Sequence, residues 1–124
     1  MKKIKLKVNF KDSRGKIVDL LEKQNINAIT YITQKKESVR GNHYHKKTIQ
    51  WNFLLKGKIT IYTKQNNEKT KKLTLKVGDL VVTPKNEPHA IKAIKNSEFL
   101  VFTQGPRGGK EYENDTYRLK IPII

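Results

Sequence analysis

Short segments of alternating polar and apolar residues follow one another at close spacing, so the sequence predicts an all-β fold. Residues 65–68 (QNNE) form a polar turn between two such segments and predict a hairpin, because asparagine tolerates turn conformations. One helical turn is expected over residues 17–23, and residues 110–115 are expected to be a polar connection. The expected strands cover residues 1–10, 28–33, 40–57 in part, 58–64, 71–77, 77–84, 89–94, 98–104 and 116–124.

All three histidines fall in two segments, RGNHYHKKTIQWNFLLKG at 40–57 and GDLVVTPKNEPHA at 78–90. His43 and His45 are two residues apart, so they leave the same face of an extended strand. In the second segment a strand leads into a tight turn that aims His89 inward. These spacings indicate one shared pocket. Neutral imidazoles in such a pocket can coordinate a divalent metal or abstract a proton near neutral pH.

Written as spacings, the segments read G-x-H-x-H-x4-Q-x6-G and G-x5-P-x-N-x2-H. They closely resemble the two motifs of the cupin superfamily. The resemblance implies a single antiparallel β-barrel of the cupin or jelly-roll type, with the histidines at its open mouth. Asn86 replaces the glycine of the second motif, a mild change because asparagine adopts left-handed turn conformations more readily than other non-glycine residues.

Gln50 stands where the superfamily has a glutamate, and this departure bears on metal binding. An amide oxygen is a neutral and weaker donor to a divalent cation than a carboxylate. Two alternatives therefore stay open. The pocket works as bare imidazoles without a cofactor, or it holds Zn, Fe, Mn or Ni through four ligands: His43, His45, Gln50 and His89.

The residues around the first histidine pair narrow the resemblance. The segment R-G-x-H-x-H-K, from Arg40 to Lys46, is similar to that of sugar-nucleotide ketoisomerases that act on dTDP-4-keto-6-deoxyglucose. R-G-x-H-Y is similar to a segment of dTDP-4-dehydrorhamnose 3,5-epimerases. Both families are cupin-fold enzymes that move protons beside a ketone without a metal. The resemblance implies that His43 or His45 is the base and that Arg40 helps to hold the nucleotide diphosphate.

Two further segments support this resemblance, which extends from Lys11 to Leu119. The D-x-R-G segment that contains Asp12 and Arg14 is similar to one that approaches the ligand in the epimerases. ENDTYRL at 113–119 resembles the D-T-Y-x-L ending of cupin domains attached to capsular-polysaccharide sugar epimerases. GPRGGK at 105–110 lacks the spacing of a nucleotide-phosphate loop and is expected to be a loop at the barrel mouth.

Proton transfer beside a carbonyl needs a base, a donor for the developing oxyanion and an acid that returns the proton. The candidates for the base and the oxyanion donor are three imidazoles and one phenol: His43, His45, His89 and Tyr62. The candidates for the returning acid are Tyr31, Tyr62 and Tyr112. The candidates for binding an anionic substrate are Arg40, Lys47 and Arg14.

The composition favours a nucleotide sugar or another small anion as partner over a nucleic acid. Lysine and arginine total 27 against 11 acidic residues, a formal charge of +16. These basic residues are mostly dispersed lysines, whereas a nucleic-acid-binding stripe concentrates charge and favours arginine. The positive field would still raise the encounter rate with an anionic metabolite. There is no cysteine, so disulfides and thiolate chemistry are excluded.

At 124 residues the chain is expected to form a single cupin domain over 1–124. No segment approaches the roughly 20 apolar residues that a membrane span needs. Lysines alternate with apolar residues over 1–10, which is typical of a strand rather than a signal peptide. The expected location is the cytoplasm.

Strand parity around Trp51 predicts a homodimer. If Gln50 points into the barrel, then Trp51, Phe53 and Leu55 face the other way. Such an apolar row needs a cover, which a second sheet or a partner subunit would supply, and the resemblance to small cupins favours the subunit; for a monomer, the N-terminal strand of the same chain would have to cover it.

Three functions remain open at this point. The leading one is isomerase or epimerase chemistry on a keto sugar nucleotide in surface-polysaccharide synthesis. The second is a metal-binding cupin with metal-assisted or oxygenase chemistry, and the third is a non-catalytic small-molecule-binding module. Fold alone does not choose among them, because one fold hosts many activities.

Overall fold

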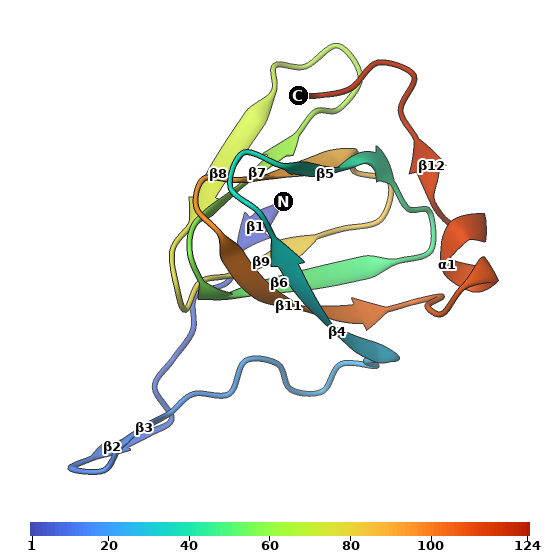
Figure 1. The fold of residues 1–124 in the computed structure, drawn as a ribbon. Coiled ribbons are helices and arrows are strands. Elements are labelled where there is room, and N and C mark those ends of the chain that lie inside the picture. Colours follow the sequence, from blue (N-terminus) through green and yellow to red (C-terminus); the bar gives the residue numbers. More distant parts are fainter.

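The computed structural model describes residues 1–124 and contains two five-stranded antiparallel sheets and a separate two-stranded hairpin (Figure 1). The first sheet has the order β1 (Lys2–Lys3), β9 (Leu80–Thr83), β6 (Ile49–Lys56), β11 (Ser97–Gln104) and β4 (Ala28–Gln34). The second has the order β12 (Tyr117–Arg118), β5 (Val39–Tyr44), β10 (His89–Ala93), β7 (Ile59–Thr63) and β8 (Lys71–Leu75). The hairpin pairs β2 (Phe10–Asp12) with β3 (Gly15–Ile17), and one short helix, α1 (Lys110–Asn114), precedes β12. No helix in the structure has the length and apolar character needed to cross a membrane.

The core lies between the two sheets and is built from alternate residues of their strands. On β11 every second residue from Ser97 to Thr103 is buried, as the two-residue period of a strand requires. Phe99 of this strand belongs to one apolar cluster with Leu54 of β6 and Ile61 of β7. Burying each such side chain contributes about 1.5–3 kcal/mol to folding. This energy fixes which face of each strand points inward.

The antiparallel all-β architecture predicted from the sequence is confirmed, but hydrogen bonding does not close it into a barrel. Each sheet keeps two edge strands, β1 and β4 in the first and β12 and β8 in the second. The two layers are therefore joined by their shared core and by connecting loops, in a jelly-roll-like sandwich.

Two predicted turns are confirmed by the backbone. β7 and β8 form the expected hairpin, and the amide of Glu68 donates to the carbonyl of Gln65 at 2.8 Å across its tip. Asn66 in this turn has a φ of 43°. Asn86, which replaces the motif glycine, has a φ of 64° and therefore takes the left-handed conformation expected of that position.

Three local predictions differ from the structure. The strand expected over 1–10 is limited to Lys2–Lys3 and the first residue of β2. Residues 18–23 contain no helix, because a pattern of about seven residues is too short to offset the cost of helix nucleation without tertiary support. The one helix lies instead in the stretch expected to be a connection, where Glu111 and Glu113 complement its amino-terminal dipole.

The outer row predicted on β6 is largely covered by the chain itself. Trp51 is only 7% exposed, Phe53 is half-buried, and Leu55 is 40% exposed. The prediction of inward and outward faces was right, since Leu54 lies in the core. Neighbouring parts of the same chain bury Trp51, the largest member of the row, so its cover does not require a second subunit.

Exposed apolar surface is found instead on the N-terminal arm, residues 5–19, which carries the β2–β3 hairpin. The arm extends away from the two sheets (Figure 1). Val8, Phe10 and Ile17 on it are between 51% and 59% exposed. A two-stranded hairpin is at best marginally stable alone in water, so this arm lacks a packing partner within the chain.

Candidate active site

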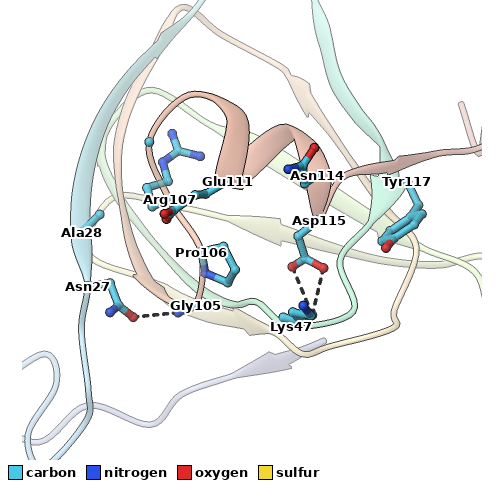
Figure 2. A pocket seen from close by; sticks show the side chains of 11 residues that line it. Asn27, Ala28, Lys47, Gly105, Pro106, Arg107, Glu111, Asn114, Asp115 and Tyr117 are labelled. Atoms are coloured by element: carbon cyan, nitrogen blue, oxygen red, sulfur yellow. Dashed lines mark hydrogen bonds between the residues drawn. The ribbon is translucent and has the colours of Figure 1, made fainter.

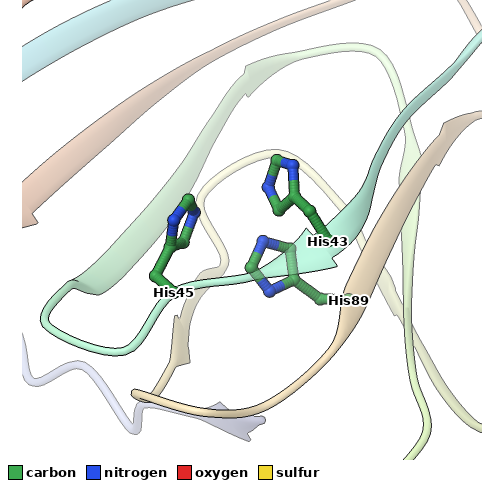
Figure 3. Close-up of side chains that lie close together, drawn as sticks. All are labelled: His43, His45 and His89. Carbon is green, nitrogen blue, oxygen red and sulfur yellow. The ribbon is translucent and has the colours of Figure 1, made fainter. Parts of the chain in front are cut away.

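The three histidines meet where β5 and β10 run side by side. His43 lies on β5 directly opposite His89, the first residue of β10, and His45 follows the end of β5. The ring centroids are 4.7 Å apart for His43 and His45 and 4.9 Å apart for His43 and His89 (Figure 3). One ring nitrogen from each residue lies within 4.8 Å of the others. The structure thus brings together the three imidazoles that the motif spacing joined.

Close approach of the two backbones makes this arrangement depend on Gly41. A Cβ atom at this position would lie 2.8 Å from the carbonyl oxygen of His89, closer than real Cβ contacts. Gly41 also has a φ of 92°, which side chains disfavour. The glycine two residues before His43 is therefore needed to bring β5 against the start of β10.

Backbone carbonyls fix the orientation of two of the rings. Nδ1 of His45 lies 2.9 Å from the carbonyl oxygen of Asp115, and Nδ1 of His89 lies 3.0 Å from that of Glu87. A carbonyl only accepts, so each Nδ1 carries the hydrogen and each Nε2 keeps a lone pair. Nε2 of His45 is buried without any hydrogen-bond partner. This atom therefore keeps a free lone pair within the histidine cluster, as a proton acceptor or a metal ligand requires.

All three imidazoles are held neutral. Burial, together with the positive charge that His89 and His45 would carry, lowers the pKa of His43 to about 3. Burial likewise lowers the pKa of His89 to about 4 and shifts that of His45 downward. Neutral imidazole is the form that accepts a proton or binds a metal, so the cluster is ready for either role at physiological pH.

His43 and His89 line a cavity of about 650 Å³ that lies between the two sheets, and His45 is buried behind them against His43. This cavity, the histidine cavity, is within the usual size range of small-ligand sites. Three of the four arginines of the chain line the cavity: Arg40, Arg107 and Arg118. No lysine and no acidic residue lines it. Arginine binds phosphate groups bidentately, so this wall is suited to a diphosphate. Gln50 and Asn52 also line the cavity, as strand parity predicted.

The predicted substrate-binding residues are only partly brought together. Arg40 lines the histidine cavity, whereas Lys47 lines a separate outer hollow of about 690 Å³ (Figure 2). Arg14 lies on the N-terminal arm, where its side chain is 84% exposed and pairs with Asp12. Lys47 and Arg14 therefore do not contact the histidine cavity of their own chain. Motif likeness placed these residues in the right segments but did not determine where each side chain points.

Tyr62 also lies away from the cavity. It alternates on β7 with the core residue Ile61, so it faces the other side of its sheet. Tyr112 of α1 takes the position expected of a phenol, with its ring centroid 5.4 Å from that of His45. Tyr31 lines the cavity too, but its hydroxyl donates to Glu98.

Sequence reasoning missed three functional candidates in the last quarter of the chain. Arg107 lies in the glycine-rich loop before α1, with its guanidinium 4.3 Å from the ring centroid of Tyr112. Arg118 lines the cavity from β12, and Asp115 binds His45. Two sequence signals pointed to these regions: the likeness of ENDTYRL, which contains Asp115 and Arg118, to the endings of capsular-polysaccharide cupin domains, and the expectation that GPRGGK, which contains Arg107, forms a loop at the barrel mouth.

A divalent metal would find suitable donors in this cluster. The buried, unpartnered Nε2 of His45 and the lone pair on Nε2 of His89 are neutral nitrogen ligands, and Gln50 adds an amide oxygen nearby. The residues therefore fit a metal, although the amide is a weaker ligand than a carboxylate.

Comparison with protein families identifies the chain. The model of the polysaccharide biosynthesis C-terminal domain matches residues 10–117. The chain belongs to this family. No curated protein sequence matches this chain significantly.

Solved structures share the fold of this domain. QdtA, a sugar 3,4-ketoisomerase from Thermoanaerobacterium thermosaccharolyticum in complex with TDP, aligns with a TM-score of 0.79 at 24% identity, over 96% of this chain and 88% of QdtA. The WlaRB TDP-quinovose 3,4-ketoisomerase from Campylobacter jejuni aligns with a TM-score of 0.79 at 20% identity, over 95% and 92% of the two chains. CapF, a capsular polysaccharide assembling protein from Staphylococcus aureus, aligns with a TM-score of 0.66 at 18% identity, over 95% of this chain but 32% of CapF. At these identities the likeness establishes the jelly-roll cupin fold.

Proposed function

We propose that this protein is a sugar-nucleotide isomerase that moves a ketone between neighbouring carbons of a nucleotide-linked deoxy sugar. The proposal rests on one cavity that is lined by three arginines and by two imidazoles of a neutral three-histidine cluster, and that no carboxylate lines. The imidazoles suit proton transfer, and the arginines suit a diphosphate. QdtA, which shares the fold, has been solved with TDP-4-keto-6-deoxyglucose, and this supports a substrate of the same class.

The reaction is redox-neutral overall. A base removes the proton from C3, next to the C4 ketone, and leaves an enediolate. A proton then returns at C4, while the hydroxyl hydrogen passes from O3 to O4, so a C–H bond breaks at C3 and another forms at C4. Each step needs a base or an acid placed within hydrogen-bond reach of the sugar.

Different residues of the site suit the base, the acid and the diphosphate contacts. His45 suits the base because its Nε2 is bare, buried and unpartnered, and His43 is the alternative. Tyr112 suits the returning acid, because it lies against His45 and lines the histidine cavity. The arginines would hold the diphosphate at a fixed distance and so place C3 and C4 against the imidazoles.

The test is incubation of the purified protein with TDP-4-keto-6-deoxyglucose in D2O, followed by NMR. The expected result is a 3-keto product with deuterium incorporated at C4. A shift in melting temperature with TDP, but no deuterium exchange with any keto sugar nucleotide, would favour the non-catalytic binding module. Neither binding nor exchange with TDP or UDP sugars would overturn the proposal.

A metal-dependent function is the second candidate, and the convergence of three ring nitrogens within 4.8 Å favours it. His43, His45 and His89 would hold the ion, with Gln50 as a fourth ligand. A bound divalent metal would act as a Lewis acid toward a substrate oxygen. Stoichiometric metal in untagged protein, together with no response to any nucleotide, would favour this candidate over the first.

We also propose that two copies form a dimer by exchanging their N-terminal arms. Each hairpin, with Phe10 and Ile17 exposed, would pack on the free edge strand β4 of the other copy. On that strand Ile29 and Tyr31 are more than half exposed. An unpaired edge is a template for another chain, and reciprocal exchange gives a closed twofold assembly.

A further inference from the structure

Asp115 is a buried carboxylate without a basic side chain as partner. It is 3% exposed and lies at the end of α1. Its oxygens accept hydrogen bonds from the backbone amides of Lys46 and Lys47 at 3.0–3.1 Å and from the hydroxyl of Thr48 at 2.6 Å. Figure 2 shows the carboxylate directed at the backbone of Lys47. All of these donors come from the three residues that follow His45.

The backbone carbonyl of the same residue binds the ring of His45, 2.9 Å from Nδ1. Asp115 is therefore hydrogen-bonded to the segment after β5 in two ways. Its side chain binds residues 46–48, and its main-chain carbonyl binds the imidazole of His45. The carboxylate fixes the position of the carbonyl relative to the turn that carries His45. Without that acceptor the ring could carry its hydrogen on either nitrogen.

Asp115 is also the inner anchor of one wall of the histidine cavity. Arg107, Tyr112 and Arg118, which line the cavity, all lie within eight residues of it. The helix between them has no buried residue of its own. Of residues 105–118, only Asp115 and Thr116 are buried, and together with the pairing of β12 and β5 they attach the segment to the second sheet.

We propose that Asp115 is the positioning residue of the site: it sets His45 in the Nδ1–H tautomer, which leaves Nε2 with a free lone pair, and it helps to anchor the segment that carries Arg107, Tyr112 and Arg118. The expected effect on turnover rests on the proposed isomerase function, but the effect on the tautomer does not. A hydrogen-bond partner that fixes the orientation of a functional imidazole is typically worth 10- to 100-fold in activity.

The primary test is the tautomer of His45, read from the ring ¹⁵N shifts of the unaltered protein at pH 7. With only three histidines in the chain, the signals can be assigned by single substitutions. We expect protonated Nδ1 and bare Nε2. A His45 ring that carries its hydrogen on Nε2 in the folded protein would overturn the proposal without any variant.

The second test compares Asp115→Asn and Asp115→Ala with the matched control Glu111→Gln. Glu111 is an exposed carboxylate on the same segment and makes no side-chain hydrogen bond in the structure. We expect kcat to fall about 10- to 100-fold in Asp115→Ala. Asp115→Asn should recover part of this loss, because it keeps one acceptor oxygen for Thr48. The fraction of His45 in the Nε2–H form should rise most in Asp115→Ala and less in Asp115→Asn. Glu111→Gln should change neither kcat nor this fraction.

The outcomes separate the two proposals. If the unaltered protein shows the expected tautomer but converts no nucleotide sugar, the proposed function fails and the role of Asp115 stands. If folded Asp115→Asn and Asp115→Ala keep both the tautomer and full turnover, Asp115 does not position His45. If Asp115→Ala does not fold, the role of Asp115 is tested by the His45 tautomer in the unaltered protein and by the tautomer and kcat of Asp115→Asn.

Discussion

His43 and His89 face each other as a directly opposed residue pair on neighbouring antiparallel strands, with their rings 4.9 Å apart and nearly perpendicular. At this distance a charge on one ring opposes a charge on the other. Burial adds to this effect, and together they lower the pKa of His43 to about 3 and that of His89 to about 4. The pair is therefore built to stay uncharged.

This neutral pair predicts that acid destabilises the fold. In the unfolded chain each histidine takes up a proton near its ordinary pKa of about 6.5, whereas in the folded protein it does not until pH 3–4. The unfolded state thus binds more protons in this window, so the free energy of unfolding should fall as the pH drops from about 6.5 to 4. The slope is at most about 1.4 kcal/mol per pH unit for each histidine.

Chemical denaturation at several pH values measures this slope. The matched variant His89→Gln removes one of the contributing groups and should flatten the profile. A free energy of unfolding that stays constant between pH 7 and pH 4 would contradict the neutral cluster.

Gln50→Glu should raise the affinity for divalent metals. Gln50 lines the histidine cavity, so the substitution places a charged oxygen beside three imidazole nitrogens. Calorimetric titration with Zn²⁺ or Mn²⁺ compares the two proteins, with Asn52→Asp as a control that adds the same charge on the same strand. Equal affinity in Gln50→Glu and the unaltered protein would remove Gln50 from the candidate ligand set.

Replacing any of the three cavity arginines by lysine should weaken TDP binding although the charge is kept. A guanidinium contacts a phosphate with two parallel hydrogen bonds, and lysine contacts it as a point charge. Hydrogen bonds to charged groups contribute about 1.5–3 kcal/mol, so we expect roughly a 10- to 100-fold loss in affinity for Arg40→Lys, Arg107→Lys or Arg118→Lys.

Lys47→Met is the control for this series, because its side chain lies in the outer hollow. Isothermal titration with TDP gives the dissociation constants. If Lys47→Met weakened TDP binding and Arg40→Lys and Arg118→Lys did not, the diphosphate would bind in the outer hollow, which Arg107 also lines.

The N-terminal arm predicts a dimer that two polar substitutions dissociate. Phe10→Ser and Ile17→Ser remove the apolar surface of the hairpin without touching the core of the two sheets. Light scattering should then change from the mass of a dimer to that of a monomer. The paired control Lys11→Ser and Lys16→Ser alters the same hairpin at exposed basic positions and should leave the dimer intact. An unaltered protein that is monomeric at micromolar concentration would exclude the exchange.

How far the sequence predicts the structure depends on the range over which each feature is determined. The pairing of His43 with His45, the inward direction of Gln50 and the turn at Asn66 follow from strand period and turn chemistry, which are local. The position of His89 followed from motif spacing. These features were predicted and found.

Features set by distant contacts were not predicted. Tyr62 and Tyr112 are both tyrosines in plausible segments, and only the packing of α1 against the end of β5 puts Tyr112 beside His45. Asp115 binds a turn almost 70 residues earlier in the chain. Parity places Trp51 on the outer face of its sheet, yet it is buried. Which part of the chain covers an outer face depends on distant segments, and the two-residue period of a strand does not encode it.

The separation of arginine from lysine gives the site a reactivity unlike that of the surface. Because none of the 23 lysines lines the histidine cavity, amine-reactive dyes or a resin that couples through amino groups would modify the exterior and leave the cavity intact. A dicarbonyl reagent such as phenylglyoxal, which attacks guanidinium groups, would instead reach the wall formed by Arg40, Arg107 and Arg118. The protein could therefore be labelled or immobilised through its abundant amines without occupying its own site.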